Sequence, residues 1–138
     1  MSKEKSVPVA SIKSIRDSVP TFPLPLKLKR LDGTDTEVEV TAKAMRKSEW
    51  AALRDAHMNV EKAELTEGEV AAPFSFVKAV GDDIRKGAEL IVKCGTGWDL
   101  ADPFSVDSLA ELEDSFGGTL ARFLGDYDAA IFQGRVGN

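Results

Sequence analysis

The residue types that most often carry out catalysis or bind metals are scarce in this chain. His57 is the only histidine and Cys94 the only cysteine, so a catalytic triad, a Cys–His pair or a zinc site would have to use one of them. His57 falls on or beside the apolar face of a predicted helix, which favours a structural role. Cys94 ends a predicted helix, whereas reactive cysteines favour helix N-termini and basic surroundings. We therefore predict a packed or half-exposed histidine, a buried cysteine and no catalytic residue.

Two other patterns resemble ligand sites without matching one. Gly95-Thr96-Gly97 looks like a phosphate-binding turn, but it lacks the further glycine of a dinucleotide fingerprint and the Lys-Ser/Thr of a P-loop. Acidic residues are frequent after residue 98, yet their spacing fits neither a calcium-binding loop nor a defined pair of glycosidase carboxylates. We predict a turn and a solvated acidic face, with no cofactor and no metal. The acidic residues are Asp99, Asp102, Asp107, Glu111, Glu113 and Asp114.

The apolar residues in the last third of the chain favour a role in protein binding. Trp98 lies in a predicted loop, residues 94–103, and tryptophan is enriched at the centres of interfaces. The alternative is a core tryptophan that forms, with Leu100 and Phe104, a hydrophobic clamp over the junction of two helices. Further candidates lie on the apolar stripe of the last helix. The candidate protein-binding residues are Trp98, Leu100, Phe104, Leu120, Phe123, Tyr127 and Ile131.

Length and composition indicate one globular domain. The chain has 138 residues, 43% hydrophobic and 30% charged, which is usual for a domain with a core and a charged surface. No apolar run approaches the ~20 residues needed to cross a bilayer, and residues 1–10 lack the features of a signal peptide. A single cysteine fits a reducing compartment. We expect a cytoplasmic protein that does not bind a membrane.

Charge is distributed unevenly along the chain. Residues 1–30 carry seven Lys or Arg against Glu4 and Asp17, a net +5, although the whole chain carries −5. From Asp99 onward, eight acids face Arg122 and Arg135, a net −6. Affinity for phosphate comes from Lys and Arg, so the acidic body argues against nucleic-acid binding. For the basic N-terminal stretch we expect a solvated tail, and contact with an acidic partner is the alternative.

The predicted architecture is α+β: one N-terminal β-hairpin followed by a mainly helical body of about four helices. Residues 1–23 predict an extended or disordered arm, because its prolines interrupt helices and strands, although Ile12 and Ile15 could form a helical turn on binding. Residues 24–138 form the single folded domain.

The hairpin is predicted over residues 24–41, where leucines and valines alternate with charged residues and Asp32 to Asp35 supply the turn. Placing Lys27 opposite Glu39, and Lys29 opposite Glu37, requires a loop with an odd number of residues, such as three. A two-residue turn would place lysine opposite valine. Two strands are marginal alone, so their apolar face must meet a helix or another subunit.

Apolar spacing predicts four helices after the hairpin. They cover residues 48–63, which Ser48 caps; residues 76–94, which Gly95 ends; a short helix capped by Ser105; and residues 119–133, between Gly117-Gly118 and Gly134. Arg135 would sit favourably at the last helix's negative end. The expected inner faces are Trp50, Leu53, His57 and Val60; then Val80, Ile84, Ala88 and Ile91; then Leu109 and Leu112; and finally Leu120, Phe123, Leu124, Tyr127, Ala130 and Ile131.

One stretch of sequence resembles a known family. The run from Gly97 to Ser105 (Gly-Trp-Asp-Leu-Ala-Asp-Pro-Phe-Ser), the acidic helix after it, Tyr127, Ile131-Phe132 and the final residues 134–138 are similar to the C-terminal half of tail assembly chaperones from long-tailed siphophages and prophages. The upstream order of a hairpin and then a helix opened by Ser48-Glu49-Trp50 is similar too. The resemblance covers roughly residues 24–138.

The resemblance implies a non-enzymatic role and specific partners. Such proteins hold the long, helical tape measure protein, recruit tail tube subunits to it in the host cytoplasm, and are absent from the mature virion. They tend to form homo-oligomers. Many are made in two forms, the longer one by a programmed ribosomal frameshift, and this chain would fit the short form. The alternative is a structural tail or head-tail connector protein. A small enzyme is a third possibility, but the sequence offers no nucleophile with its base.

Overall fold

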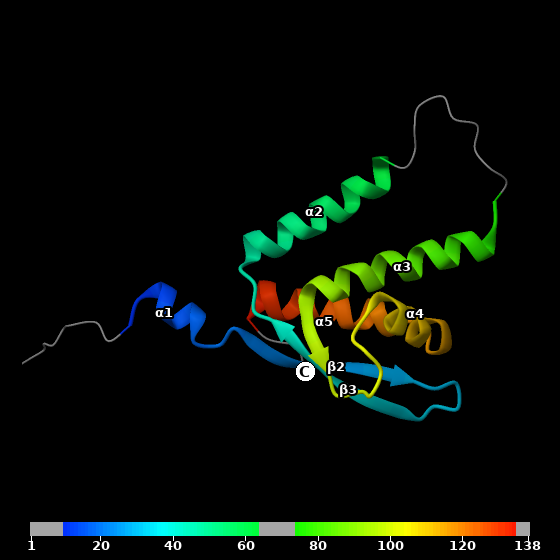
Figure 1. Ribbon diagram of the computed structural model, residues 1–138, viewed down its shortest axis with the longest axis horizontal. Helices are drawn as coiled ribbons and strands as arrows, with labels where there is room; N and C mark the ends of the chain where they lie inside the picture. The colour runs from blue at the N-terminus through cyan, green and yellow to red at the C-terminus, as the bar shows by residue number, and fades with distance from the viewer. Residues whose placement is uncertain (1–9, 64–73, 135–138) are drawn as a thin grey trace, which may run out of the picture.

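The computed structural model describes residues 10–63 and 74–134 and has the predicted α+β architecture (Figure 1). The calls on residues 1–9, on the link at 66–73 and on Arg135 lie outside the described residues, as does the side chain of Val60. The elements are α1 (Ile12–Asp17), β2 (Thr21–Lys29), β3 (Asp35–Lys43), α2 (Lys47–Ala63), α3 (Phe76–Cys94), β4 (Gly95–Trp98), α4 (Val106–Ser115) and α5 (Thr119–Gln133).

A three-stranded antiparallel sheet in the order β2-β3-β4 forms one layer. The hairpin β2-β3 confirms the predicted one, and each strand extends beyond the predicted limits. Strand β2 begins at Thr21, inside the segment predicted as an arm, and Phe22 packs against the core. The leucine and valine face of the hairpin is buried, and α5 lies across it (Figure 1).

The pairing register differs from the prediction. Lys27 lies opposite Glu37, and Lys29 opposite Asp35. The odd loop length is confirmed, because the N–H of Arg30 donates to the Thr34 carbonyl (2.8 Å) and closes a three-residue loop. Gly33, the third loop residue, has φ +92°, the left-handed conformation that follows a type I turn in such hairpins. The loop is centred one residue earlier than expected, so every pair shifts by two residues.

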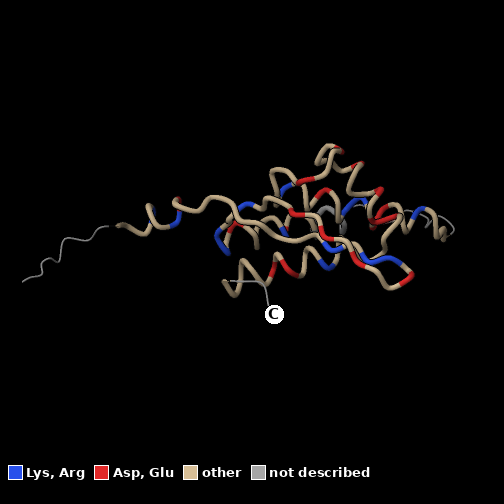
Figure 2. The backbone as a smooth tube through the Cα atoms, turned by 90° about the horizontal axis from the view of Figure 1, so that it is seen from below, with Lys and Arg blue, Asp and Glu red and all other residues tan. Residues whose placement is uncertain are grey.

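Strand β2 has a free edge that two prolines block. Pro23 and Pro25 lie opposite Thr41 and Glu39. In an antiparallel pair, backbone groups point alternately toward and away from the neighbouring strand. Because the N–H of Arg30 points toward β3, the backbone nitrogens of Pro23 and Pro25 point away from it. Proline has no N–H to offer another strand, and prolines on an edge hinder the addition of further strands. Lys27 and Lys29 on β2, and Asp35, Glu37 and Glu39 on β3, alternate with uncharged residues, and charged positions are spread over the described backbone (Figure 2).

The third strand corrects the sequence analysis, which expected residues 94–103 to form a loop. Gly95–Trp98 pairs with β3, with an irregularity between Thr41 and Ala42. Gly95 directly follows α3 in extended conformation (φ −126°). A Cβ atom at Gly95 would lie 2.8 Å from the Phe104 ring, so the absence of a side chain permits this close packing. The glycine expected only to end the helix also starts a strand.

The predicted limits of α3 (76–94) and α5 (119–133) are confirmed. Ser105 caps α4 as expected, accepting a hydrogen bond from the Ser108 N–H (3.2 Å). The cap predicted at Ser48 is wrong, because α2 already begins at Lys47, and the Glu49 carboxylate accepts from the N–H of Arg46 (2.9 Å). The buried position predicted for Val80 is also wrong: its side chain is exposed, because the first half of α3 extends past the sheet.

Helix α5 is the centre of the core. Leu120, Phe123 and Tyr127 are buried against β2 and α3, together with Trp50 from α2. The Tyr127 hydroxyl donates to the Lys43 carbonyl (2.7 Å). Its ring meets that of Trp50 edge-on, with centroids 4.8 Å apart. Helices α2 to α5 therefore contribute to one core on one side of the sheet.

Candidate functional site

The stripe of α5 that was predicted to bind a partner is largely covered within the same subunit. Leu120, Phe123 and Tyr127 are buried, and Ile131 is half-buried against the core. Burial also raises the pKa of the Tyr127 hydroxyl above its usual value. In this conformation these three buried side chains stabilise the domain and are not accessible to a partner.

The Trp98 loop is ordered and only partly exposed. Trp98, Leu100 and Phe104 are half-buried and pack against the core, which agrees with the expected hydrophobic clamp. The indole N–H of Trp98 donates to the Asp102 carbonyl (2.7 Å), and its ring meets that of Phe104 edge-on at 5.3 Å. Within the clamp these side chains hold the loop over α4. Their exposed edges remain candidates for contact with a partner.

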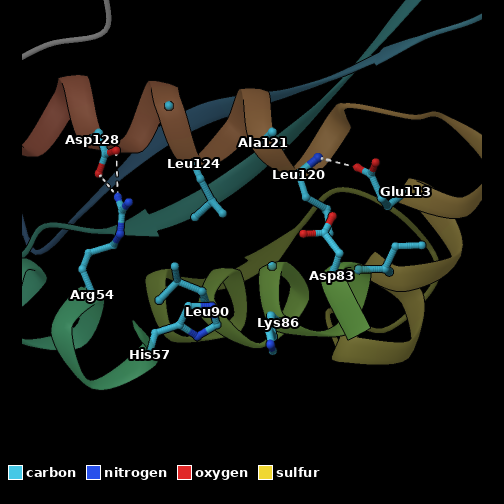
Figure 3. Close-up of a pocket in the computed structure, with 13 residues that line it drawn as sticks. Arg54, His57, Asp83, Lys86, Leu90, Glu113, Leu120, Ala121, Leu124 and Asp128 are labelled. Carbon is cyan, nitrogen blue, oxygen red and sulfur yellow. Dashed lines mark hydrogen bonds and ion pairs between the residues drawn. The ribbon is translucent and has the colours of Figure 1, made fainter. Parts of the chain in front are cut away.

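A groove of about 410 Å³ lies between α2, α3 and α5 (Figure 3). We call it the central groove. Leu90, Leu120 and Leu124 contribute its apolar floor, so the edge of the α5 stripe reaches solvent here. Charged and polar groups surround this floor from four helices. They are Arg54 and His57 from α2, Asp83 and Lys86 from α3, Glu113 from α4 and Asp128 from α5.

Asp128 joins two walls of the central groove. Its carboxylate accepts from the indole N–H of Trp50 (2.5 Å) and from Arg54, with both oxygens 2.8 Å from one guanidinium nitrogen (Figure 3). The Arg54 guanidinium also lies 5.5 Å from the centroid of the Trp50 ring, within the range of a cation–π contact. These contacts fix the start of α2 against α5. The sequence analysis missed them, although Trp50 and Arg54 share a helix face at i, i+4.

Glu113 builds the end of the groove where α5 begins. Gly118, at the N-cap of α5, has φ +84° and no side chain that could accept a hydrogen bond. The Glu113 carboxylate replaces it, accepting from the N–H groups of Gly118 (2.8 Å) and Leu120 (2.9 Å). A negative charge at a helix N-terminus is favourable. One of the acids predicted as merely solvated therefore holds α4 and α5 together.

His57 and Cys94, the residues with catalytic potential, lie where the sequence predicted them. His57 is half-buried in the groove wall, as predicted. Cys94 is fully buried, as predicted; its thiol donates to the Leu90 carbonyl (3.3 Å), and burial raises its pKa to about 12. Within residues 10–63 and 74–134, no three His, Cys, Asp or Glu side chains form a group that could hold a metal ion. An apolar floor with charged walls suits binding.

A second accessible apolar surface was not foreseen. Phe74, Phe76, Val77 and Val80 are exposed around the start of α3, and the two phenylalanine rings meet edge-on, 4.7 Å between centroids. We call these four residues the α3 patch. The sequence analysis missed it because the apolar periodicity of α3 continues into the part of the helix that projects past the core.

The comparison with protein families finds a match. A family model described as phage tail assembly chaperone matches residues 1–138. No curated protein and no solved structure matches the chain. In the described part of the chain, none of the helices is both long and apolar enough to cross a membrane.

Proposed function

The chain belongs to the family of phage tail assembly chaperones, and we propose that it binds the tape measure protein and recruits tail tube subunits to it during tail assembly. The observation that carries this proposal is the family match over the full 138 residues. The role is non-enzymatic. It is exercised in the host cytoplasm, and the chaperone leaves before the virion is complete.

The central groove is the surface we propose for a helix of the tape measure protein. An amphipathic helix binds by laying its apolar face into a hydrophobic groove, with anchors at i, i+3, i+4 and i+7. The leucine floor offers a contact for such anchors, and the Arg54, Lys86 and Asp83 side chains around it offer charges of both signs. The half-exposed Trp98 loop is a second proposed contact, for the tail tube subunits.

A capture experiment tests the groove. The tagged chain is used to capture the tape measure protein of the same phage or prophage, and Ala121→Glu is compared with wild type. Ala121 is exposed and lines the groove, so a larger charged side chain obstructs it without disturbing the core. We expect at least a roughly tenfold loss of captured protein, as for an interface hot spot.

Leu31→Glu is the matched control, since it adds the same charge at the fully exposed tip of the hairpin. Equal capture by wild type and Ala121→Glu would contradict the groove assignment. Mass spectrometry of purified virions separates the chaperone from a structural tail or connector protein. We expect no peptide of this chain there, and stoichiometric amounts would favour the structural role.

A further inference from the structure

A small pocket lies between the Trp98 loop and α4. Its volume is about 130 Å³, which exceeds the roughly 10–15 Å³ that one water needs but is well below the 410 Å³ of the central groove. This size suits one long side chain and not a helix. We call it the Trp98 pocket. Its lining includes the half-buried Trp98, Leu100, Leu112 and Phe116, and the exposed Asp102 and Glu111.

Both sides of the Trp98 pocket are held in place by contacts within the chain. The N–H of Asp99 donates to the Glu39 carbonyl (3.2 Å), and the Asp99 carboxylate accepts from the N–H of Glu39 (3.0 Å), so the loop is fixed to β3. The indole N–H of Trp98 donates to the Asp102 carbonyl (2.7 Å), which keeps Asp102 near the indole. Ser105 caps α4 on the other side. A preformed site loses less conformational entropy when it binds.

The Trp98 pocket lies in a stretch of chain that contains acids and no base. Residues 94–121 include six Asp or Glu and no Lys, Arg or His. Two of the six have structural partners, because Asp99 bonds to β3 and Glu113 caps α5. Within the described residues, Asp102 and Glu111 take part in no ion pair. The rim of the pocket therefore carries two carboxylates whose charge no neighbouring cation balances in that part of the chain.

An arginine side chain matches this lining. Its aliphatic stem packs on apolar surface, and its planar guanidinium stacks on aromatic rings and donates to carboxylates. The leucines and aromatic rings of the pocket suit the stem and the plane, and the two rim carboxylates suit the charge. The ammonium of lysine is more strongly hydrated and does not stack, so it gains less from the aromatic part of the lining.

We propose that the Trp98 pocket binds an arginine side chain of the tail tube subunit. This inference rests on the proposed function, which assigns the tail tube subunits to the Trp98 loop, and it adds the pocket and the residue type that recognise them. The acidic stretch attracts a basic surface over about 8–10 Å at physiological salt and so speeds association. The pocket then selects the side chain that anchors the complex.

Capture of purified tail tube subunits by the tagged full chain tests the pocket. Asp102→Asn combined with Glu111→Gln removes both rim charges and preserves the side-chain shapes. Both positions are exposed, and the Asp102 carbonyl that accepts from Trp98 is retained, so the fold is preserved. We expect a loss of affinity of at least roughly tenfold, as for an anchoring charge pair at an interface.

The matched control is Asp107→Asn combined with Asp114→Asn. It removes two exposed charges of α4 that do not line the Trp98 pocket, and its affinity should stay within about threefold of wild type. Equal affinity of the pocket variant and wild type would overturn the inference and leave the proposed function intact. Equal losses for both double variants would assign the effect to general attraction of charge and would also overturn it. Wild type that captures no tail tube subunit would overturn recruitment itself.

A small probe tests the chemistry of the pocket without the partner. N-acetyl-arginine amide carries the guanidinium, and N-acetyl-citrulline amide has nearly the same shape without the charge. Each is titrated to about 1 mM and above, the range of weak single contacts, while NMR follows the indole N–H signals of Trp98 and of the fully buried Trp50. We expect a saturable shift of the Trp98 signal alone, with the arginine compound alone, and none in the pocket variant. A Trp98 signal that does not move, or that moves equally with citrulline, would overturn the assignment of arginine.

Discussion

At the scale of single residues, the contacts of Asp128 are ones that the apolar periodicity of the sequence could not reveal. It is separated from Trp50 and Arg54 by more than 70 residues, and nothing in local sequence pairs a carboxylate with an indole so far away. His57 and Cys94 followed the prediction because the pattern of their own helices determines their burial. Polar contacts between helices depend on the register in which the helices pack.

Replacement of Asp128 by alanine should lower the free energy of unfolding by about 2 kcal/mol, because the buried indole N–H of Trp50 loses its acceptor. Denaturant unfolding measures the change. Asp128→Asn is the matched control, since its amide oxygen still accepts from Trp50 while the charge on Arg54 is no longer balanced. Its loss should be clearly smaller. Equal losses for both variants would assign the effect to the ion pair.

The buried thiol of Cys94 should make stability depend on alkaline pH. Its pKa is about 12 in the folded chain against 9.0 ordinarily, so the unfolded state loses the proton first. The buried thiol's contribution to the free energy of unfolding is fully present below pH 9 and is lost as the pH rises toward 12. The free energy of unfolding then falls by at most about 1.4 kcal/mol per pH unit. Cys94→Ala should have a shallower slope between pH 9 and 11. An unchanged slope would show that Cys94 makes no such contribution.

At the scale of elements, the helices were predicted better than the sheet. The limits of α3 and α5 follow from long apolar periodicity between glycine breaks. Strand β4 has four residues, Gly95 to Trp98, with no alternation of its own, and it exists because β3 offers it an edge. The buried position of Val80 was predicted wrongly because periodicity identifies a face but not how far along the helix the core extends. The α3 patch was missed for the same reason.

The cap of α5 can be tested at this scale. Glu113→Ala removes the acceptor of two N–H groups at a glycine N-cap, and it should destabilise the domain by about 1–2 kcal/mol. The shift in thermal midpoint measures the loss. Glu111→Ala, also on α4 but exposed, should change stability by less than about 0.5 kcal/mol. Similar shifts for both would argue that α5 needs no acidic cap.

At the scale of the whole molecule, one core holds the sheet and helices together and leaves three partly apolar surfaces open. The central groove lies among α2, α3 and α5, the α3 patch lies at one end of the molecule, and helix α1 lies at the other (Figure 1). A chaperone needs accessible apolar surface on a charged, soluble body. The described residues present such surfaces on a charged body.

The amount of soluble tape measure protein, measured after co-expression with and without this chain, tests that account most directly. We predict that the chain moves most of the tape measure protein from the insoluble to the soluble fraction and co-purifies with it, while Ala121→Glu does neither. A tape measure protein that is equally insoluble with and without the chain would contradict the chaperone function.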